Sequence, residues 1–332
     1  MKDIAQELGV SLMTVSKALR NHSDISEKTR ARVVRRAQQL GYQPNWVARS
    51  LVARRTFMVG LVIPDLMHSF FAEVAKGVAK KLGPMGYQIV IADSEESPET
   101  EERQIELLLA RNLDGFIIAS AQGNSGAGCL GSFSARKTPH VFIDRIPSTL
   151  AGHYVGVKDS EIGALATSHL IEQGCRRIAH IRGPAISTGA GRLQGYRRAL
   201  ANGNLVAPRE YVIHGQHRDN TGYIAMQTLL TLNPRPDGVF CYNDPVAAGA
   251  IKAILEAGLR VPQDVAIVGA GNVHYSDLLR VPLSTIDQSS LALGETAAEL
   301  LVQCMEARKA LAPRRVWIPP RLVVRESSQR RL

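Results

Sequence analysis

The sequence has few aromatic residues, few cysteines and no long apolar run. Aromatic residues make up 5% of the 332 residues, and the four cysteines stand far apart, at positions 129, 175, 241 and 304. This spacing fits neither a disulfide framework nor paired zinc ligands, so free and buried thiols are expected. The longest apolar runs, such as residues 58–63, are far shorter than the ~20 residues that a membrane span needs. We therefore expect no membrane anchor.

Motifs of catalysis and cofactor binding are missing as well. The sequence holds no phosphate-binding P-loop, no Gly-x-Ser-x-Gly nucleophile turn and no His-Glu-x-x-His zinc motif. Gly189-Ala190-Gly191 and Gly269-Ala270-Gly271 each start a dinucleotide-binding fingerprint without completing it. His214 and His217 lie on a strand and its loop, where their spacing turns them to opposite faces more often than not. We expect no catalytic residue, no metal site and no cofactor, which leaves a sugar-metabolising enzyme as a weak alternative.

The N-terminus carries no recognisable secretory leader. Met1-Lys2-Asp3 leads directly into an amphipathic stretch, with no apolar core and no small-residue cleavage site. The chain is 45% apolar and 21% charged, with a mean hydropathy of -0.05, as in ordinary globular proteins. We expect a soluble, cytoplasmic protein of two or three domains.

Positive charge is concentrated at the N-terminal end. Residues 1–55 hold eleven basic and four acidic residues, a net charge of +7, whereas the other 277 residues carry +3 from 29 basic and 26 acidic residues. A small basic head on a nearly neutral body is the layout expected where the head binds a polyanion. A solvated basic helix face is the plainer alternative.

The head has the pattern of short helices joined by tight turns. Apolar residues within 4–8 share a helix face, Gly9 ends that helix, and a second helix begins after Ser11, a good N-cap. Residues 26–40 predict a third helix, and residues 45–54 predict a short helical segment with too few apolar residues to fold alone. The first two helices form a candidate helix-turn-helix.

In a helix-turn-helix motif the second helix enters the major groove of DNA, where its side chains reach base edges. The candidates for base contact are Leu12, Met13, Ser16 and Lys17. The candidates for phosphate contact are Ser11, Thr14, Asn21 and Thr29. A purely structural αα-hairpin would show the same local pattern, so the motif alone is a weak signal.

From Phe57 onward, short β-rich runs alternate with longer amphipathic stretches. This alternation predicts parallel sheets with helices on both faces. About ten strands over this length fit two α/β subdomains facing each other across a cleft better than one very wide sheet. Ligands of open parallel sheets bind beyond the carboxyl ends of the strands, so the site residues are sought there.

Several motifs, in order along the whole chain, resemble the lactose-repressor/galactose-repressor (LacI/GalR) family. They are Lys2-Asp3-Ile4-Ala5, Gly9-Val10-Ser11, Thr14-Val15-Ser16, Gly41-Tyr42-Gln43-Pro44-Asn45, Ala48-Arg49-Ser50-Leu51, Phe70-Phe71-Ala72-Glu73, Leu113-Asp114-Gly115, Asn243-Asp244, 258–265 and 321–327. The resemblance implies a dimeric transcription regulator with a core like type I periplasmic sugar-binding proteins. The sequence departs from the family pattern at its start, because a Thr or Val-Thr usually precedes the Lys-Asp pair in the family.

The resemblance also implies a division of the chain. Residues 1–42 would form the helix-turn-helix DNA-binding domain, 43–56 the hinge helix and 57–332 the core. Within the core, an N-subdomain is expected over about 57–156 plus 286–315 and a C-subdomain over about 157–285 plus 316–332. The hinge would contact DNA through Asn45, Ala48 and Leu51, with Leu51 wedged into the minor groove. Packing of Leu51 against the other hinge of a dimer is compatible with that role.

For the effector cleft, the resemblance assigns six positions, one by one. They are Phe71, Asp144, Arg192, His217, Asn243 and Gln288. Arg192 offers five fixed donors to hydroxyls or a carboxylate. Plainer roles exist for two of them, because Asp144 could pair with Arg145 and Asn243 could cap the following helix.

Two departures limit what the resemblance says about the effector. Gly271 stands where most relatives have an acid, and His217 stands where relatives often have a stacking aromatic residue. Residues 188–192 resemble the purine repressor, but the arginine just upstream in that protein has no counterpart, Ile186 being the nearest residue. We expect a sugar or a sugar acid rather than a purine.

The sequence thus predicts a ligand-responsive transcriptional repressor that binds a pseudo-palindromic operator on double-stranded DNA as a homodimer. The expected fold class is α + α/β. An α-helical part, the helix-turn-helix head and the hinge helix, is followed by a core of two α/β subdomains like a type I periplasmic binding protein. No heptad tail follows Ser328, so no coiled-coil tetramer is expected. The alternative is a solute-binding receptor of the periplasmic type, which would share the core but require export.

Overall fold

The computed structural model describes residues 1–19, 21–42, 50, 55–122, 133, 136–145, 152–206, 208–215 and 219–330. The chain divides into two compact units, Met1–Thr56 and Phe57–Leu332. Among the residues described, no helix is both long and apolar enough to cross a membrane. Each unit has a hydrophobic core of its own.

The N-terminal unit is built from α1 (Lys2–Leu8), α2 (Leu12–Leu19) and α3 (Glu27–Gln39). Ile4, Val15 and Val33, one from each helix, are almost completely buried against one another. Hydroxyl groups start the later helices, because Ser11 Oγ accepts from the Thr14 N–H at 3.0 Å and Ser26 Oγ caps α3. The predicted helix-turn-helix is present.

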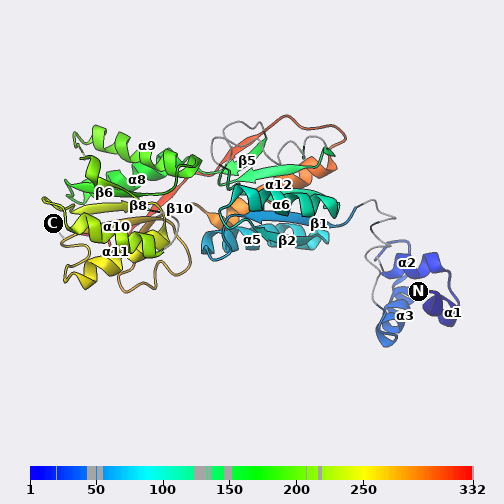
Figure 1. Cartoon of the computed structure of the whole chain (residues 1–332). Coiled ribbons are helices and arrows are strands. Elements are labelled where there is room, and N and C mark those ends of the chain that lie inside the picture. The colour runs from blue at the N-terminus through cyan, green and yellow to red at the C-terminus, as the bar shows by residue number, and fades with distance from the viewer. Residues whose placement is uncertain are drawn as a thin grey trace. The chain divides into compact units, whose positions relative to one another are not determined.

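The first lobe of the core contains a six-stranded parallel sheet in the order β11-β5-β4-β3-β1-β2. Its strands are β1 (Met58–Ile63), β2 (Gln88–Asp93), β3 (Gly115–Ile118), β4 (His140–Ile143), β5 (His153–Gly156) and β11 (Arg315–Trp317). Its helices are α5 (Ser69–Leu82), η1 (Gly83–Met85), α6 (Pro98–Ala110) and α12 (Ser290–Glu306). Figure 1 shows α5, α6 and α12 along the sheet of this lobe.

The second lobe has the same design. Its sheet runs in the order β12-β10-β9-β8-β6-β7 and is parallel except for the antiparallel pair of β10 and β12. The strands are β6 (Ile178–Arg182), β7 (Val212–His214), β8 (Gly238–Cys241), β9 (Ala266–Gly271), β10 (Ser284–Asp287) and β12 (Arg321–Val323). The helices are α8 (Asp159–Glu172), α9 (Ser187–Asn202), η2 (Arg209–Tyr211), α10 (Asp219–Leu230) and α11 (Asp244–Glu256).

Both sheets are covered on both faces, which the period of two in a strand explains. In β1, Leu61 packs with α5 and α12, whereas Val62 packs with α6. In β8, Val239 packs with α10 and α11, whereas Phe240 packs with α8 and α9. Figure 1 shows α8 and α9 on one side of the second sheet and α10 and α11 on the other.

The chain passes between the two lobes three times. The passages follow β5, which ends at Gly156, β10, which ends at Asp287, and β11, which ends at Trp317. The subdomain boundaries expected at 285/286 and 315/316 therefore cut through β10 and β11. Strand pairing corrects them, because β10 pairs wholly with β9 and β11 wholly with β5.

Helix α9 begins at Ser187, and two of its glycines lie against α8. A Cβ on Gly195 would lie 2.2 Å from the Ser160 carbonyl oxygen of α8, and one on Gly191 would lie 2.6 Å from the Cβ of Asp159. These glycines permit a close contact between two helices rather than a loop. Arg192 is consequently fixed inside a helix, one turn from its N-terminus.

Candidate functional site

A cleft lies between the two lobes, where the carboxyl ends of both sheets meet. Its lining comes from the segments after β1, β4, β8 and β10, from the end of β9 and from α9. The lining residues are His68, Phe70, Phe71, Asp144, Arg145, Arg192, Tyr242, Asn243, Ala270 and Gln288. The enclosed volume is only about 20 Å³, which is room for one water molecule. In this structure the lobes are closed on each other.

Arg192 forms the centre of the polar contacts on the second lobe. Its guanidinium donates to Asp159 Oδ1 at 3.0 Å, to the Tyr242 carbonyl at 2.6 Å and to Gln288 Oε1 at 3.1 Å. It also lies over the Tyr242 ring, 4.7 Å from the centroid. Only 3% of Arg192 is exposed, so these partners compensate for its lost hydration.

Two carboxyl groups in the cleft have raised pKa values. Burial raises the pKa of Asp159 to about 6, against the opposing charge of Arg192. Burial also raises the pKa of Asp144, with Arg145 and Arg192 opposing the shift. A carboxyl group with a raised pKa keeps its proton to a higher pH than an ordinary carboxyl group does. Shifted pKa values of this kind are common in binding sites.

Arg145 fixes the first-lobe side of the cleft. It binds Glu96 through two hydrogen bonds of 2.6 and 2.9 Å, and its Nε lies 3.5 Å from Asp144 Oδ2. The guanidinium carbon lies 5.8 Å from the centroid of the Phe71 ring. The pairing of Asp144 with its neighbour therefore occurs, and it occurs inside the cleft.

Asn243 has both of the roles considered for it. Its Oδ1 accepts from the Val246 N–H at 2.9 Å and so caps α11, while its Nδ2 lies 3.2 Å from Nε2 of His68 on the other lobe. The adjacent Asp244 is turned away from the cleft. It accepts from the Val273 N–H at 3.1 Å and from Ser276 Oγ at 2.7 Å, so it holds the loop after β9.

The structure brings together five of the six positions assigned to the effector. Phe71, Asp144, Arg192, Asn243 and Gln288 all line the cleft, whereas His217 lies outside the described residues. Phe71 is only 2% exposed and packs edge-to-face on Phe70, so it offers little open ring surface here.

Sequence reasoning missed His68, Tyr242 and Asp159 as parts of this site. Each carries a positional signal that was available. His68 caps the helix that follows β1, Tyr242 follows β8 immediately, and Asp159 begins α8 directly after the passage between the lobes. All three stand where the carboxyl ends of strands or the crossovers meet the cleft.

On the head, the residues predicted to contact bases form an exposed surface of α2. Leu12 is 45% exposed and Met13 is 62% exposed, although both are apolar. Ser16 is half-buried, and Lys17 forms an exposed ion pair with Asp24. Asn21 has a φ of 59° just after α2, and Thr29 lies in the first turn of α3. The predicted hinge residues Asn45, Ala48 and Leu51 lie outside the described residues.

The described part of the chain contains no group of three His, Cys, Asp or Glu side chains placed to hold a metal ion. Its cysteines are free thiols: Cys175 and Cys241 are buried, and Cys304 is half-buried, which differs from the burial expected for all of them.

Comparisons with known proteins agree with this arrangement. Residues 1–45 match the family described as bacterial regulatory proteins, lacI family, and residues 167–328 match the periplasmic binding protein-like domain. The HTH-type transcriptional repressor PurR of Mannheimia succiniciproducens is 33% identical over 98% of this chain and 98% of its own.

Two solved structures are similar over the same length. A lac repressor dimer bound to operator and the anti-inducer ONPF has a TM-score of 0.84 at 26% identity, with 98% of each chain covered. A complex of the transcriptional regulator CelR with cellobiose has a TM-score of 0.76 at 31% identity, also with 98% of each chain covered.

A helix-turn-helix head joined to a two-lobed core with a polar cleft defines a ligand-responsive, DNA-binding transcriptional regulator. The chain belongs to the LacI family of bacterial regulatory proteins. The alternative of a solute-binding receptor is not favoured, because the relatives named are repressors that match this chain from its DNA-binding head to its core.

Proposed function

We propose that this protein represses transcription by binding a pseudo-palindromic operator as a homodimer, and that a sugar or sugar acid held between the lobes changes its affinity for DNA. The observation that carries the proposal is the closed cleft, whose lining joins both lobes through buried polar side chains. The relatives and structural neighbours named above, repressors and sugar-bound or operator-bound regulators, support it.

The closed volume explains how a ligand would act. A cavity of about 20 Å³ does not hold a sugar, so a sugar binds only when the lobes move apart. A ligand that binds one lobe arrangement more tightly than another shifts the population between them. The contacts that would be exchanged include His68 with Asn243 and Glu73 with the backbone N–H of His274 at 3.1 Å.

In this proposal Arg192 and Gln288 bind ligand hydroxyl or carboxylate groups, Asn243 and Asp144 complete the polar set, and Phe71 supplies an apolar side. His217 belongs to the same proposed set. A sugar fits these groups better than a purine does, because carboxylate, amide and guanidinium groups pair with multiple hydroxyls. The PurR relatives make purines the necessary comparison in any test.

The proposal assigns DNA contact to the exposed face of α2, through Leu12, Met13, Ser16 and Lys17. Backbone phosphates are assigned to Ser11, Thr14, Asn21 and Thr29, and the minor groove to the hinge residues Asn45, Ala48 and Leu51. It assigns no chemistry to the cleft, so the protein would bind its ligand without converting it. Incubation with free and phosphorylated sugars is expected to give no turnover.

A thermal-shift screen of the purified protein tests the ligand class directly. Sugars, sugar acids, sugar phosphates and purines are compared, because a ligand at about 100 times its Kd stabilises by about 2.7 kcal/mol. Stabilisation by a sugar or sugar acid, coupled to a change in affinity for DNA from the protein's own promoter region, supports the proposal. Stabilisation by purines alone contradicts the proposed ligand class.

A further inference from the structure

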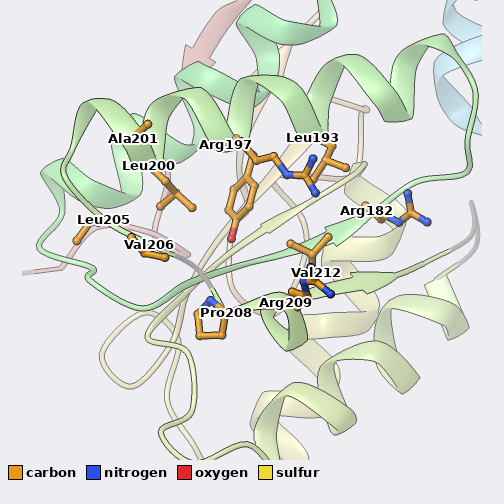
Figure 2. Close-up of a pocket in the computed structure, with 11 residues that line it drawn as sticks. Arg182, Leu193, Arg197, Leu200, Ala201, Leu205, Val206, Pro208, Arg209 and Val212 are labelled. Atoms are coloured by element: carbon orange, nitrogen blue, oxygen red, sulfur yellow. The ribbon is translucent and has the colours of Figure 1, made fainter.

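A second hollow lies on the second lobe, apart from the cleft. It lies between α9, the segment that follows it and the edge of the sheet at β6 and β7, and its volume is about 650 Å³. Figure 2 shows Leu193, Arg197 and Leu200 of α9 above it, Arg182 at one side and Arg209 below. The volume lies within the range of small-molecule pockets.

The lining has two kinds of surface. Leu193, Leu200, Leu205 and Val212 give it an apolar wall, of which Leu200 is buried and the others are half-buried. Leu193, Arg197 and Leu200 stand at i, i+4 and i+7 of α9 and so share one face of the helix. The lining of this hollow and the lining of the cleft share no residue.

Three guanidinium groups surround the hollow. Arg182, Arg197 and Arg209 all line it, and within the described part of the chain none of the three forms a side-chain hydrogen bond or an ion pair. Six other arginines of this core differ from these three, because each has an acidic partner within 4.0 Å: Arg145, Arg177, Arg192, Arg260, Arg321 and Arg325.

We propose that this hollow binds an organic phosphate with an apolar body, such as an aryl or alkyl phosphate monoester. A phosphate dianion would neutralise most of the charge of three neighbouring guanidinium groups through charge-assisted hydrogen bonds. The leucine and valine side chains would cover an apolar body that inorganic phosphate lacks. A concave pocket of this volume favours a small molecule over a nucleic acid strand, which binds along extended grooves.

The site differs from the effector cleft but uses the same helix. Arg192 and Arg197 are five residues apart on α9, so a ligand in the hollow contacts the element that carries the central arginine of the cleft. The hollow is therefore placed to modulate the response of the regulator as a second input.

Isothermal titration calorimetry on the full-length protein tests the proposal in a phosphate-free buffer. Phenyl phosphate is the probe, inorganic phosphate supplies the head alone, and phenol supplies the body alone. We expect phenyl phosphate to bind at least about tenfold more tightly than either fragment. Arg197→Gln and Arg209→Gln should each weaken its binding by about tenfold or more, because each removes a charged donor.

Arg198→Gln is the matched control. Arg198 is adjacent on α9 but does not line the hollow, and its Nη2 donates to the Ser160 carbonyl at 3.2 Å. This variant should bind phenyl phosphate as the wild type does. Retained binding in Arg197→Gln and Arg209→Gln would overturn the proposal, as would phenyl phosphate binding no tighter than inorganic phosphate. Thermal unfolding of each variant confirms that the exposed substitutions leave the fold intact.

Discussion

Arg192 and Asp159 form an ion pair inside the closed cleft, with Nε of the arginine 3.0 Å from Oδ1 of the aspartate and both side chains largely buried. The pair joins the helix that bears the central donor, α9, to the start of α8, which directly follows a passage between the lobes. An effector that takes up donors of Arg192 therefore acts on the segment that connects the lobes.

The pKa of Asp159 predicts a pH dependence of stability. Burial raises this pKa from 3.8 to about 6, so between these values the folded state binds more protons than the unfolded state. The free energy of unfolding contributed by this group therefore falls as the pH rises through this window. From near pH 7 to near pH 5, wild type should gain about 1 kcal/mol relative to Asp159→Asn.

Urea denaturation of both proteins at the two pH values measures this difference. Titrating groups that do not interact with Asp159 contribute equally to wild type and variant and cancel in the comparison, whereas Asp144, whose charge acts on Asp159, contributes to the difference. An unchanged difference between wild type and Asp159→Asn at the two pH values would show that Asp159 does not titrate in this window.

Because α8 and α9 pack closely, adding a single methyl group between them should lower the free energy of unfolding. Gly195→Ala places a Cβ 2.2 Å from the Ser160 carbonyl oxygen, and backbone on both sides leaves no flexible group to yield. We expect a loss of about 1–3 kcal/mol in the free energy of unfolding. Gly83→Ala is the comparison without a packing clash, since a Cβ there meets nothing within 4 Å, and only the preference of a non-glycine residue before Pro84 for extended backbone opposes it. Equal stability of the two variants would contradict the packing described.

We expect a substitution of the exposed methionine of α2 to weaken DNA binding without lowering the stability of the protein. Met13 is 62% exposed, so Met13→Ala should leave thermal unfolding unchanged and weaken operator affinity by about fivefold to tenfold. Fluorescence anisotropy with labelled promoter DNA measures the affinity. Met67→Ala, at a 90% exposed methionine of the core, should change neither property. Identical DNA affinities for both variants would remove Met13 from the interface.

Periodicity predicted the regular elements well where local patterns are strong. Residues 58–63 form β1 as expected, and the second and third helices of the head begin at hydroxyl caps. The sequence pattern did not predict β5, β10, β11, β12 or α12. These elements lie near the passages between the lobes. The strands among them are short and pair with segments that are distant in the sequence, so no local alternation of β-rich runs and amphipathic stretches reveals them. The pairing of β11 with β5, for example, spans more than 150 residues.

The candidate site was predicted in its positions but not in its contacts. The strand-end principle and the family resemblance located Asp144, Arg192 and Asn243 in one cleft. Neither could show that Arg192 already bonds Asp159 or that Asn243 faces His68, because these contacts depend on how two lobes fold back on each other. Gly271 illustrates the same limit: its φ of 140° is a conformation that side chains rarely adopt, which is not visible in the sequence.

The most direct test of the account is operator affinity with and without the ligand found by thermal shift, in wild type and in Asp144→Asn. This substitution keeps the shape of the side chain, while removing a carboxylate from the cleft lining. The account predicts a ligand-dependent change of about 5-fold to 150-fold in wild type and a much smaller change in Asp144→Asn at the same ligand concentration. Equal responses of the two proteins would contradict the claim that the cleft between the lobes controls DNA binding.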